Sequence, residues 1–563
     1  MKVVLTVLNA QYVHMALAPW SLKAACADLC EVVVREYTIN RDDRAILRSL
    51  VAERPDVLGF CTYLFNIEQV CALAADIKAL LPETVIIFGG PEAGYDPAVF
   101  RNCPAVDYVV RGEGETPLRG LLEALRDGLE PQIPGVATRE RDCPPVVESN
   151  PDALPSPYTD EMLAASAGRI LYFEASRGCP FRCAYCLSSL GGGARFFASD
   201  RVCTELARVL HSPAKQIKFV DRTFNCRLPR AKEIVSAVLA MAAEEPAIAS
   251  KHIHFEVAAD LFDDELIGLF AQAPVGLFQL EIGIQSFHAP TLEAVHRASD
   301  LMRCARAISR LCTPYNVHIH TDLIAGLPLE DYTVFARSFD ALYALAPHCI
   351  QLGFLKMLKG AEMRAVADRT PGYLYCEKPP YQILQTPWMS FMELGKLEDI
   401  AFCVERLYNS GRFTLSLPYL IARFPTPFAF YEAFAKALRA HGCFARPISY
   451  QEVCAELVAF AQTCFSSEQT DALRVLMRFD FYRCDNSGNP PHCLPREAPV
   501  CARALYAGQK GRRVHFEAFP FDPPAFARTG QKSGQAVYCF NYTHRHPVTG
   551  LYAVEKTEIP PRL

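Results

Sequence analysis

The chain has 563 residues, of which 51% are hydrophobic and 21% are charged, as in soluble globular proteins, which excludes a disordered or collagen-like chain. Lysine and arginine number 57 against 62 aspartate and glutamate, and this net charge of −5 argues against a dedicated nucleic-acid-binding protein, which would carry a basic excess. At ~150 residues per domain, the length predicts three or four domains.

The 23 cysteines point to a reducing compartment. The first apolar run, Val3–Leu8, has strand length and is followed by polar Asn9, so no secretion signal is expected. No run of ~18 apolar residues predicts a membrane span. We therefore expect a cytoplasmic protein in which most thiols are reduced and any tight cysteine cluster holds a metal.

Residues 1–130 alternate short apolar runs with segments of helical spacing. The predicted strands are Lys2–Leu8, Glu31–Tyr37, Asp56–Thr62, Thr84–Phe88 and Asp107–Val110, and Ile67–Leu80 has helical spacing. Continuous Val and Ile runs suit parallel strands that are buried on both faces. This pattern predicts an α/β domain with a doubly wound, Rossmann-like sheet.

Polar residues and glycines cluster where these strands end. They lie in Asn9–His14, Cys61–Asn66, Gly89–Glu92 and Arg111–Glu115. Any one of these loops could be ordinary turn chemistry. Because the carboxyl ends of parallel strands share one edge of the sheet, the set together favours a ligand site there.

Three further regions follow. Residues 131–164 are proline-rich and predict a connector. Residues 165–365 return to strand–helix alternation and predict a partial β/α barrel, whose site lies at the carboxyl ends of its strands. Its predicted strands are Ile170–Ala175, Gln216–Val220, His252–Val257, Leu277–Ile284, Val317–Ile324 and Cys349–Leu355. Residues 366–563 predict a mixed α+β domain, with helical spacing in Glu393–Tyr408 and Tyr450–Ala461 and an aromatic, β-rich end.

The strongest motif directly follows the first barrel strand. Cys179, Cys183 and Cys186 form a Cys-x-x-x-Cys-x-x-Cys pattern in one loop, with Tyr185 before the third cysteine. Soft thiolates select zinc or iron–sulfur centres. A structural zinc site needs four ligands, and no fourth ligand lies nearby at zinc spacing. Three thiolates on a 4Fe-4S cluster leave one iron open to a small molecule. The alternatives are three buried thiols or a zinc loop.

This motif and its place after a barrel strand closely resemble the radical S-adenosylmethionine (SAM) enzymes. The resemblance implies that the three cysteines hold a 4Fe-4S cluster, whose open iron takes the amine and carboxylate of SAM. Residues that resemble the family's SAM-lining positions are Tyr185, Ser188, Asp221, Glu256, Glu281, Gln285 and Leu327. Many relatives hold the SAM amine with a Gly-Gly-Glu strand end; this chain has Gly191-Gly192-Gly193 without the glutamate, so Ser188 or backbone is expected to take that place.

A doubly wound domain before such a barrel resembles the cobalamin-binding branch, here with a C-terminal domain of unknown function. The cobalamin contacts that this implies are Tyr12, Thr62, Tyr63, Asn66, Gly89, Gly90, Pro91 and Glu113. The Asp-x-His-x-x-Gly motif that supplies a cobalt-binding histidine is absent from residues 1–127. We therefore expect base-off cobalamin with no protein nitrogen below cobalt, and a loop or surface role for His14.

The resemblance implies an enzyme that cleaves SAM reductively and uses cobalamin, first of all for methyl transfer to an unactivated carbon. The alternatives are a cobalamin-assisted rearrangement or cyclisation, and a non-catalytic iron–sulfur sensor. A flavodoxin or ferredoxin would supply the electron. Membrane and nucleic-acid partners are not indicated, and the substrate is not specified by the sequence. The C-terminal domain is expected to gate the substrate; its candidate polar residues are Arg478, Asp480, His515, His544 and His546.

Overall fold

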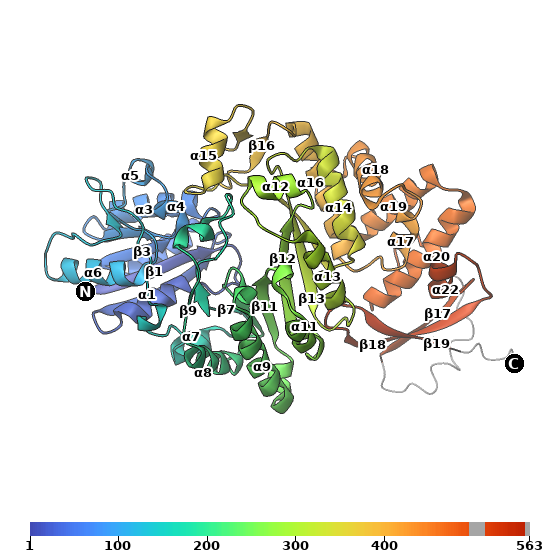
Figure 1. Cartoon of the computed structure of the whole chain (residues 1–563), viewed down its shortest axis with the longest axis horizontal. Helices are drawn as coiled ribbons and strands as arrows, with labels where there is room; N and C mark the ends of the chain where they lie inside the picture. Colours follow the sequence, from blue (N-terminus) through green and yellow to red (C-terminus); the bar gives the residue numbers. More distant parts are fainter. Residues whose placement is uncertain (495–512, 558–563) are drawn as a thin grey trace. The chain divides into compact units, whose positions relative to one another are not determined.

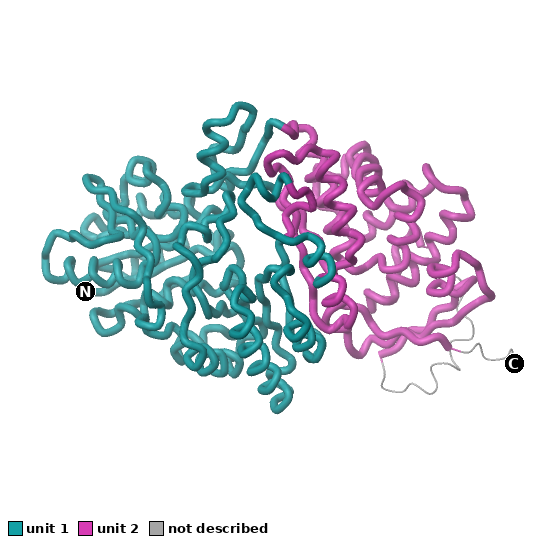
Figure 2. Tube along the Cα trace, viewed as in Figure 1, with its two compact units in different colours: residues 1–283, 290–307, 354–387 teal, residues 284–289, 308–353, 388–563 magenta. Residues whose placement is uncertain are grey.

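The computed structural model describes residues 1–494 and 513–557, which form two compact units (Figure 2). Unit 1 contains residues 1–283, 290–307 and 354–387. Unit 2 contains residues 284–289, 308–353 and 388–563. The N-terminal domain, the cysteine motif, three barrel strands and most of a fourth belong to unit 1, and each unit is described by itself below.

The N-terminal domain is built on a six-stranded sheet with the order β2-β1-β3-β4-β5-β6, which confirms the doubly wound fold (Figure 1). Its strands are β1 (Lys2–Asn9), β2 (Glu31–Thr38), β3 (Val57–Cys61), β4 (Val85–Gly89), β5 (Tyr108–Val110) and β6 (Val136–Ala137). The first five strands are parallel and β6 is antiparallel. Strand order reverses between β1 and β3, the position at which such sheets bind ligands.

Helices cover both faces of this sheet because alternate strand residues point to opposite sides. On one face, Val4 and Leu58 pack against α2 (Asp43–Glu53) and α3 (Ile67–Leu80). On the other face, Val3 and Leu5 pack against α1 (Ala18–Cys26) and α6 (Glu115–Arg126). Short helices α4 (Pro91–Gly94) and α5 (Val99–Asn102) follow β4. The predicted strands agree with these to within one or two residues, and α3 has the predicted bounds.

The proline-rich connector is part of the first domain's surface. It supplies the antiparallel edge strand β6, and Val146 exchanges backbone hydrogen bonds with Arg111 and Glu113. It then forms η1 (Pro151–Ala153) and α7 (Asp160–Ala165) before the barrel begins.

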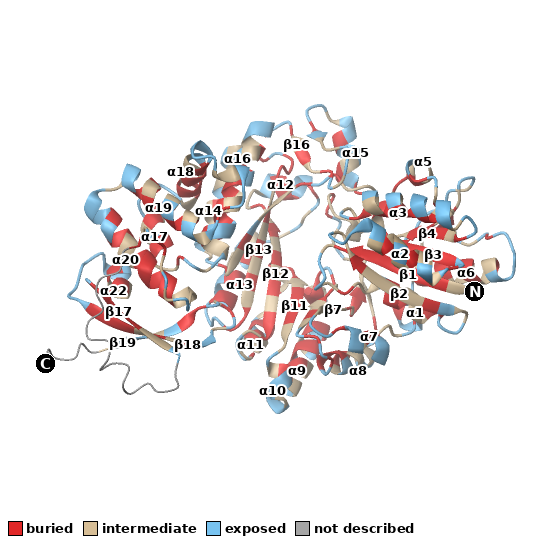
Figure 3. Ribbon diagram, turned by 180° about the vertical axis from the view of Figure 1, so that it is seen from behind, coloured by how far each residue is buried: buried red, intermediate tan, exposed pale blue. Residues whose placement is uncertain are grey.

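The barrel sheet has the strand order β14-β13-β12-β11-β10-β7, an open six-stranded arrangement that confirms a partial barrel. Its strands are β7 (Ile170–Phe173), β10 (Gln216–Phe219), β11 (His252–Val257), β12 (Phe278–Gln285), β13 (His318–Ala325) and β14 (Cys349–Phe354). The intervening helices are α8 (Ser199–Leu210), α9 (Leu228–Glu244), α10 (Pro246–Ala249), α11 (Asp264–Ala271), α12 (Ala289–Ala294), α13 (Leu301–Cys312) and α14 (Tyr332–Ala344). In β12 and β13 buried residues alternate with half-buried ones, so the two faces of each strand differ in exposure (Figure 3).

The C-terminal region combines helices with an antiparallel sheet, as predicted. Its elements are α15 (Glu362–Arg369), β15 (Leu374–Tyr375), β16 (Ile383–Gln385), α16 (Phe391–Val404), α17 (Ser416–Ile421), α18 (Pro427–Ala440), α19 (Tyr450–Cys464), α20 (Ser467–Cys484), β17 (Val514–Phe519), α22 (Pro523–Thr529), β18 (Ala536–Arg545) and β19 (Tyr552–Thr557). The last turns of α16 continue as a π-helix over Glu405–Asn409. Throughout the described residues, every helix is too short or too polar to cross a membrane.

The polar residues proposed for the C-terminal domain have structural partners. Asp480 is fully buried and accepts hydrogen bonds from Thr414 and from the backbone and hydroxyl of Ser416, so it fixes the start of α17. Arg478 donates to the carbonyl of Ala518, and His515 stacks on Tyr482.

Candidate cofactor-binding site

The cysteine motif lies in a loop closed by a two-stranded hairpin. Strand β8 (Ser176–Arg177) pairs antiparallel with β9 (Arg195–Phe196), so the chain leaves and returns at the same place. Gly178 begins the loop with a φ of +79°, and a Cβ there would lie 2.2 Å from the carbonyl oxygen of Gly193. Only glycine fits this crossing, which explains the glycine directly before Cys179.

The three cysteines face different surroundings within the loop. Cys183 is buried, whereas Cys179 and Cys186 are half-buried. The amide of Cys186 donates to the carbonyl of Cys183, which holds these two residues on one turn. Among the residues that the structure describes, no three His, Cys, Asp or Glu side chains converge on one point, as the ligands of a single metal ion must. A 4Fe-4S cluster needs a wider set because each thiolate binds its own iron.

Arg297, which the sequence reasoning missed, completes this loop. One of its guanidinium nitrogens donates to Sγ of Cys183 at 3.7 Å, and the other donates to the carbonyl of Gly283 in β12. The side chain is half-buried, and although burial lowers the pKa of Arg297, Tyr185 and Cys183 raise it above its usual value. A fixed cation thus lies beside a thiolate, where it stabilises negative charge.

Asp221 anchors the segment that enters the loop. One carboxylate oxygen accepts from the amide of Ala175 at 2.9 Å and the other from the hydroxyl of Ser176 at 2.5 Å. Burial raises its pKa to about 6. Both oxygens are therefore used within the protein, and the contact of Asp221 with SAM stays a prediction.

Glu256 and Glu281 lie on the interior face of the barrel wall in unit 1. Lys218 lies 3.4 Å from Glu281 and 4.0 Å from Glu256, and His254 lies 3.1 Å from Glu281. Arg222 lies 3.6 Å from the other oxygen of Glu256. Burial raises the pKa of Glu256 and lowers the pKa of His254. Both glutamates are thus available to a polar ligand, but each already has a cationic neighbour.

The other predicted SAM contacts lie on separate elements. Ser188 lies in η2 (Leu187–Gly191), directly after the last cysteine. Gln285 ends β12 with a φ of +72°, and its Oε1 is buried without a hydrogen-bond partner among the described residues. Leu327 follows β13 and is fully buried. An unsatisfied buried acceptor fits a ligand that brings a donor, as the ribose of SAM would.

At the carboxyl edge of the first sheet, Thr62 holds two strand ends together. Its amide and hydroxyl both donate to the carbonyl of Gly89 at 2.7 Å, and its hydroxyl accepts from Ala93. Gly90 has a φ of +96°, and a Cβ there would lie 2.6 Å from the carbonyl oxygen of Thr62. Pro91 then starts α4. Asn66 donates to the carbonyls of Leu8 and Cys61, so it also orders this edge.

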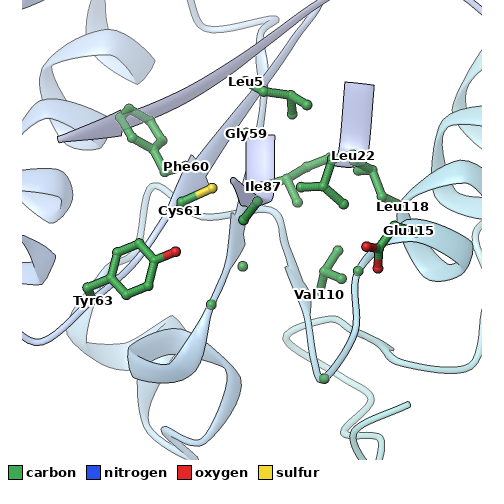
Figure 4. A pocket seen from close by; sticks show the side chains of 15 residues that line it. Leu5, Leu22, Gly59, Phe60, Cys61, Tyr63, Ile87, Val110, Glu115 and Leu118 are labelled. Carbon is green, nitrogen blue, oxygen red and sulfur yellow. The ribbon is translucent and has the colours of Figure 1, made fainter. Parts of the chain in front are cut away.

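A cavity of about 140 Å³ opens between this edge and helices α1 and α6 (Figure 4). Its lining includes Gly59 and Gly90, where a Cβ would lie within 3 Å of another atom, together with Gly89 and apolar side chains such as Leu22 and Leu118. Tyr63 lies at one side and Glu115 at the other. The apolar walls and bare glycine backbone suit a flat aromatic group, such as the dimethylbenzimidazole end of a base-off cobalamin.

Three other residues from the first domain have defined places. Tyr12 is 71% exposed, with the guanidinium of Arg169 over its ring. Glu113 pairs with Arg195 and Arg177 of the β8–β9 hairpin, so its charge is already compensated. His14 bonds through Nδ1 to the hydroxyl of Tyr172 in β7 at 2.8 Å. Burial, Lys218 and Arg169 lower its pKa.

Three family models match the chain. These are a B12 binding domain over residues 3–122, the radical SAM superfamily over residues 173–340, and a domain of unknown function, DUF4080, over residues 370–509. The matches follow the three regions in order and include the cavity and the cysteine loop. The cofactors of such a chain are a 4Fe-4S cluster, SAM and cobalamin, and the thiols, the unsatisfied Gln285 and the apolar cavity fit them.

Curated relatives include methyltransferases and two anaerobic magnesium-protoporphyrin IX monomethyl ester cyclases. The chain is 29% identical over 355 residues to 2-(S-pantetheinyl)-carbapenam-3-carboxylate methyltransferase of Streptantibioticus cattleyicolor, which covers 58% of this chain and 51% of the relative. It is 28% identical to the cobalamin-dependent radical SAM methyltransferase TokK of Streptomyces tokunonensis, covering 52% of this chain and 46% of the relative. The chain thus spans about half the length of these relatives.

Solved structures share the fold. The radical SAM methyltransferase TsrM of Kitasatospora setae matches with a TM-score of 0.57 at 19% identity, over 68% of this chain and 79% of that one. The cobalamin-dependent enzyme OxsB matches with a TM-score of 0.57 at 15% identity, over 85% of this chain and 78% of that one. By the three matched family models, the chain combines an N-terminal B12 binding domain, a central radical SAM domain and a C-terminal DUF4080 domain.

Proposed function

We propose that the protein is a cobalamin-dependent radical SAM methyltransferase that acts on an unactivated carbon. When bound, the cluster would supply the electron that cleaves SAM, and cobalamin would carry the methyl group. Cys179, Cys183 and Cys186 would bind the cluster, and Arg297 would stabilise its negative charge. Ser188 or the backbone after Cys186 would bind the SAM amine, with Glu256 as a further SAM contact and Gln285 binding the ribose. Thr62, Gly90 and Tyr63 would hold the cobalamin.

One contact in unit 1 carries this proposal. Glu115 lines the apolar cavity, and its carboxylate accepts a hydrogen bond from Arg177 at 2.6 Å. Arg177 directly precedes Gly178 and Cys179, so the cavity and the cysteine loop share a buried ion pair. Two cofactor sites tied by one salt bridge favour a reaction that needs both cofactors together.

The products of SAM distinguish the possible reactions. Methyl transfer from SAM leaves S-adenosylhomocysteine, whereas reductive cleavage leaves 5′-deoxyadenosine and methionine. We expect the reconstituted protein, given cobalamin, SAM and dithionite, to form both products. 5′-Deoxyadenosine without S-adenosylhomocysteine would instead favour a rearrangement or cyclisation. Absence of both products with an intact cluster would favour an iron–sulfur sensor.

The barrel wall of unit 1 narrows the class of substrate. Its interior positions are almost all hydrogen-bonding groups: Tyr172, Gln216, Lys218, His252, His254, Glu256, Gln279 and Glu281. Although several of these groups pair with one another, a lipid placed against this wall would still remove water from charged side chains such as Lys218 and Glu281, which is costly. We infer a polar substrate, in contrast to the hopanoid that names a relative from Methylococcus capsulatus, 31% identical over 175 residues and covering 29% of this chain and 34% of that enzyme.

We also propose a cytoplasmic location and a flavodoxin or ferredoxin as reductant. The described cysteines are free thiols, in keeping with a reducing compartment. The cluster must be reduced before each SAM cleavage, so it needs a one-electron donor of low potential. Flavodoxin and ferredoxin are both donors of this kind.

A further inference from the structure

A segment after the barrel, residues 355–387, contacts both cofactor sites of unit 1. We call it the strap. It contains α15 and the β15–β16 pair, drawn in yellow in Figure 1, and it belongs to unit 1 although the chain on either side belongs to unit 2. The radical SAM model ends at residue 340 and the DUF4080 model begins at residue 370, so residues 355–369 of the strap lie outside both models.

Met363, within the strap, binds the cysteine loop. The amide of Met363 donates to the carbonyl of Ala184 at 2.8 Å, and Ala184 lies between Cys183 and Cys186. The Met363 side chain is 1% exposed, so this contact is dry. Backbone hydrogen bonding at Ala184 fixes the middle of the motif from outside the loop.

Two other residues of the strap, Lys359 and Tyr381, bind the carboxyl edge of the first sheet. The hydroxyl of Tyr381 donates to Glu92 at 2.7 Å, and both side chains are nearly fully buried. Lys359 lies 2.8 Å from Asp96 and 3.5 Å from Glu92. Glu92 directly follows Gly90-Pro91 at the predicted cobalamin edge. Its buried carboxylate therefore has its hydrogen-bonding and cationic partners in the strap.

The two anchors are joined stiffly. Arg364, next to Met363, donates to the carbonyl of Met357 at 2.8 Å and places its guanidinium 5.0 Å from the centre of the Tyr381 ring. The amide of Met357 in turn donates to the carbonyl of Tyr381 at 2.9 Å. A displacement at one anchor is therefore transmitted to the other rather than absorbed by a loose loop.

We propose that the strap is a spacer that fixes the cobalamin-binding edge at a set distance from the cysteine loop, with Tyr381 and Lys359 as positioning residues for methyl transfer. This inference rests on the proposed function. Radical chemistry between two bound cofactors needs their reacting atoms aligned, and a misplacement of ~1 Å can cost about a hundredfold in rate. Neither residue touches the cysteines, so the spacer acts through Glu92 and Ala184.

The test uses the full protein loaded with both cofactors and reduced to paramagnetic cluster and Co(II). The magnetic coupling between the two spins depends steeply on their separation. We expect one well-defined coupling in the wild type, and its loss to a broad distribution in Tyr381→Phe and in Lys359→Met, with cluster and cobalamin contents unchanged. The matched controls are Tyr375→Phe, whose hydroxyl bonds Asp368, and Lys378→Met, whose partner is Glu68 on the surface. Both should keep the wild-type coupling.

Two results would overturn the spacer. One is an unchanged coupling in both Tyr381→Phe and Lys359→Met; the other is loss of bound cobalamin in these variants, which would make the strap a binding element. Failure of the proposed function looks different: a wild type with one defined coupling but no S-adenosylhomocysteine would remove methyl transfer and leave the spacer standing. If the wild type binds no cobalamin, the spacer proposal falls unless amide hydrogen exchange shows that Tyr381→Phe loosens residues 89–96 and the cysteine loop together.

Discussion

The guanidinium of Arg297 donates a hydrogen bond to Sγ of Cys183 across 3.7 Å, from the loop between α12 and α13 in unit 1. The same group donates to the backbone of β12, so the cation cannot turn away from the thiol. A donor fixed beside a cluster thiolate stabilises the more negative, reduced cluster.

We therefore expect Arg297→Met to lower the reduction potential of the cluster by ~60 mV, the one-electron equivalent of the ~1.5 kcal/mol expected for a hydrogen bond to a charged group. An EPR-monitored redox titration measures it. Arg182→Met, in an exposed residue of the same loop, is the control and should leave the potential unchanged. An unaltered potential in Arg297→Met would show that the contact is absent once the cluster is in place.

Each of Cys179→Ala, Cys183→Ala and Cys186→Ala should abolish the 4Fe-4S absorption and with it SAM cleavage. Removing one thiolate opens a second iron and leaves the cluster unstable. Cys443→Ala, outside the motif and in the C-terminal domain, should retain both properties. The assignment is wrong if loss of Cys443 weakens the cluster as much as loss of a motif cysteine.

The strand pattern was readable from the sequence because buried parallel strands are short runs of Val, Ile and Leu. The helix over Ile67–Leu80 was predicted with its final bounds. The cysteine motif was equally plain, since its ligands lie within eight residues of one another in a single loop.

What the sequence could not show were contacts between residues far apart in the chain. Arg297 reaches Cys183 from the loop between α12 and α13, more than a hundred residues later, and nothing in its local pattern distinguishes it from a surface arginine. The resemblance implies that Glu113 contacts cobalamin, and this stays a prediction; the sequence did not show that its carboxylate pairs with two arginines of the β8–β9 hairpin. Ion pairs of this kind form between residues that are far apart in the chain, so the spacing of residues in the sequence does not reveal them.

Gly90→Ala should weaken cobalamin binding by at least about tenfold while the cluster assembles normally. Its φ of +96° strains any other residue, and the added Cβ would lie 2.6 Å from Thr62 O, so the loop must move. Gly168→Ala is the control, because Gly168 also has a positive φ, +72°, but has open space around it. This variant introduces backbone strain without a collision. Equal losses of affinity in the two variants, measured by equilibrium dialysis, would contradict a role for Gly90 in shaping the cobalamin edge.

Asp221 should make stability fall as pH rises. Burial raises its folded-state pKa to about 6 from 3.8, so between these values the folded protein binds the proton more strongly than the unfolded chain does. The contribution of Asp221 to the free energy of unfolding is therefore largest below pH 4 and is lost as the pH rises through 6. Relative to Asp221→Asn, the wild type should lose about 1 kcal/mol of unfolding free energy between pH 5 and pH 7. Asp160→Asn, whose side chain is 99% exposed, should show the wild-type pH profile in the same urea titrations.

His14 should not be the lower ligand of cobalt. His14 is not among the residues that line the apolar cavity, and its backbone is held beside β7 by hydrogen bonds of its neighbours Val13 and Met15 with Ile170. Its Nδ1 also bonds the hydroxyl of Tyr172, which directs the ring toward the barrel strand. We expect the bound Co(II) cobalamin to be base-off, with an EPR spectrum free of nitrogen superhyperfine splitting in both wild type and His14→Ala. Tyr172→Phe, which frees the imidazole without removing it, should give the same spectrum. Splitting that is present in the wild type and vanishes in His14→Ala would make His14 the ligand. Splitting that appears only in Tyr172→Phe would show instead that Tyr172 is what keeps the imidazole from cobalt.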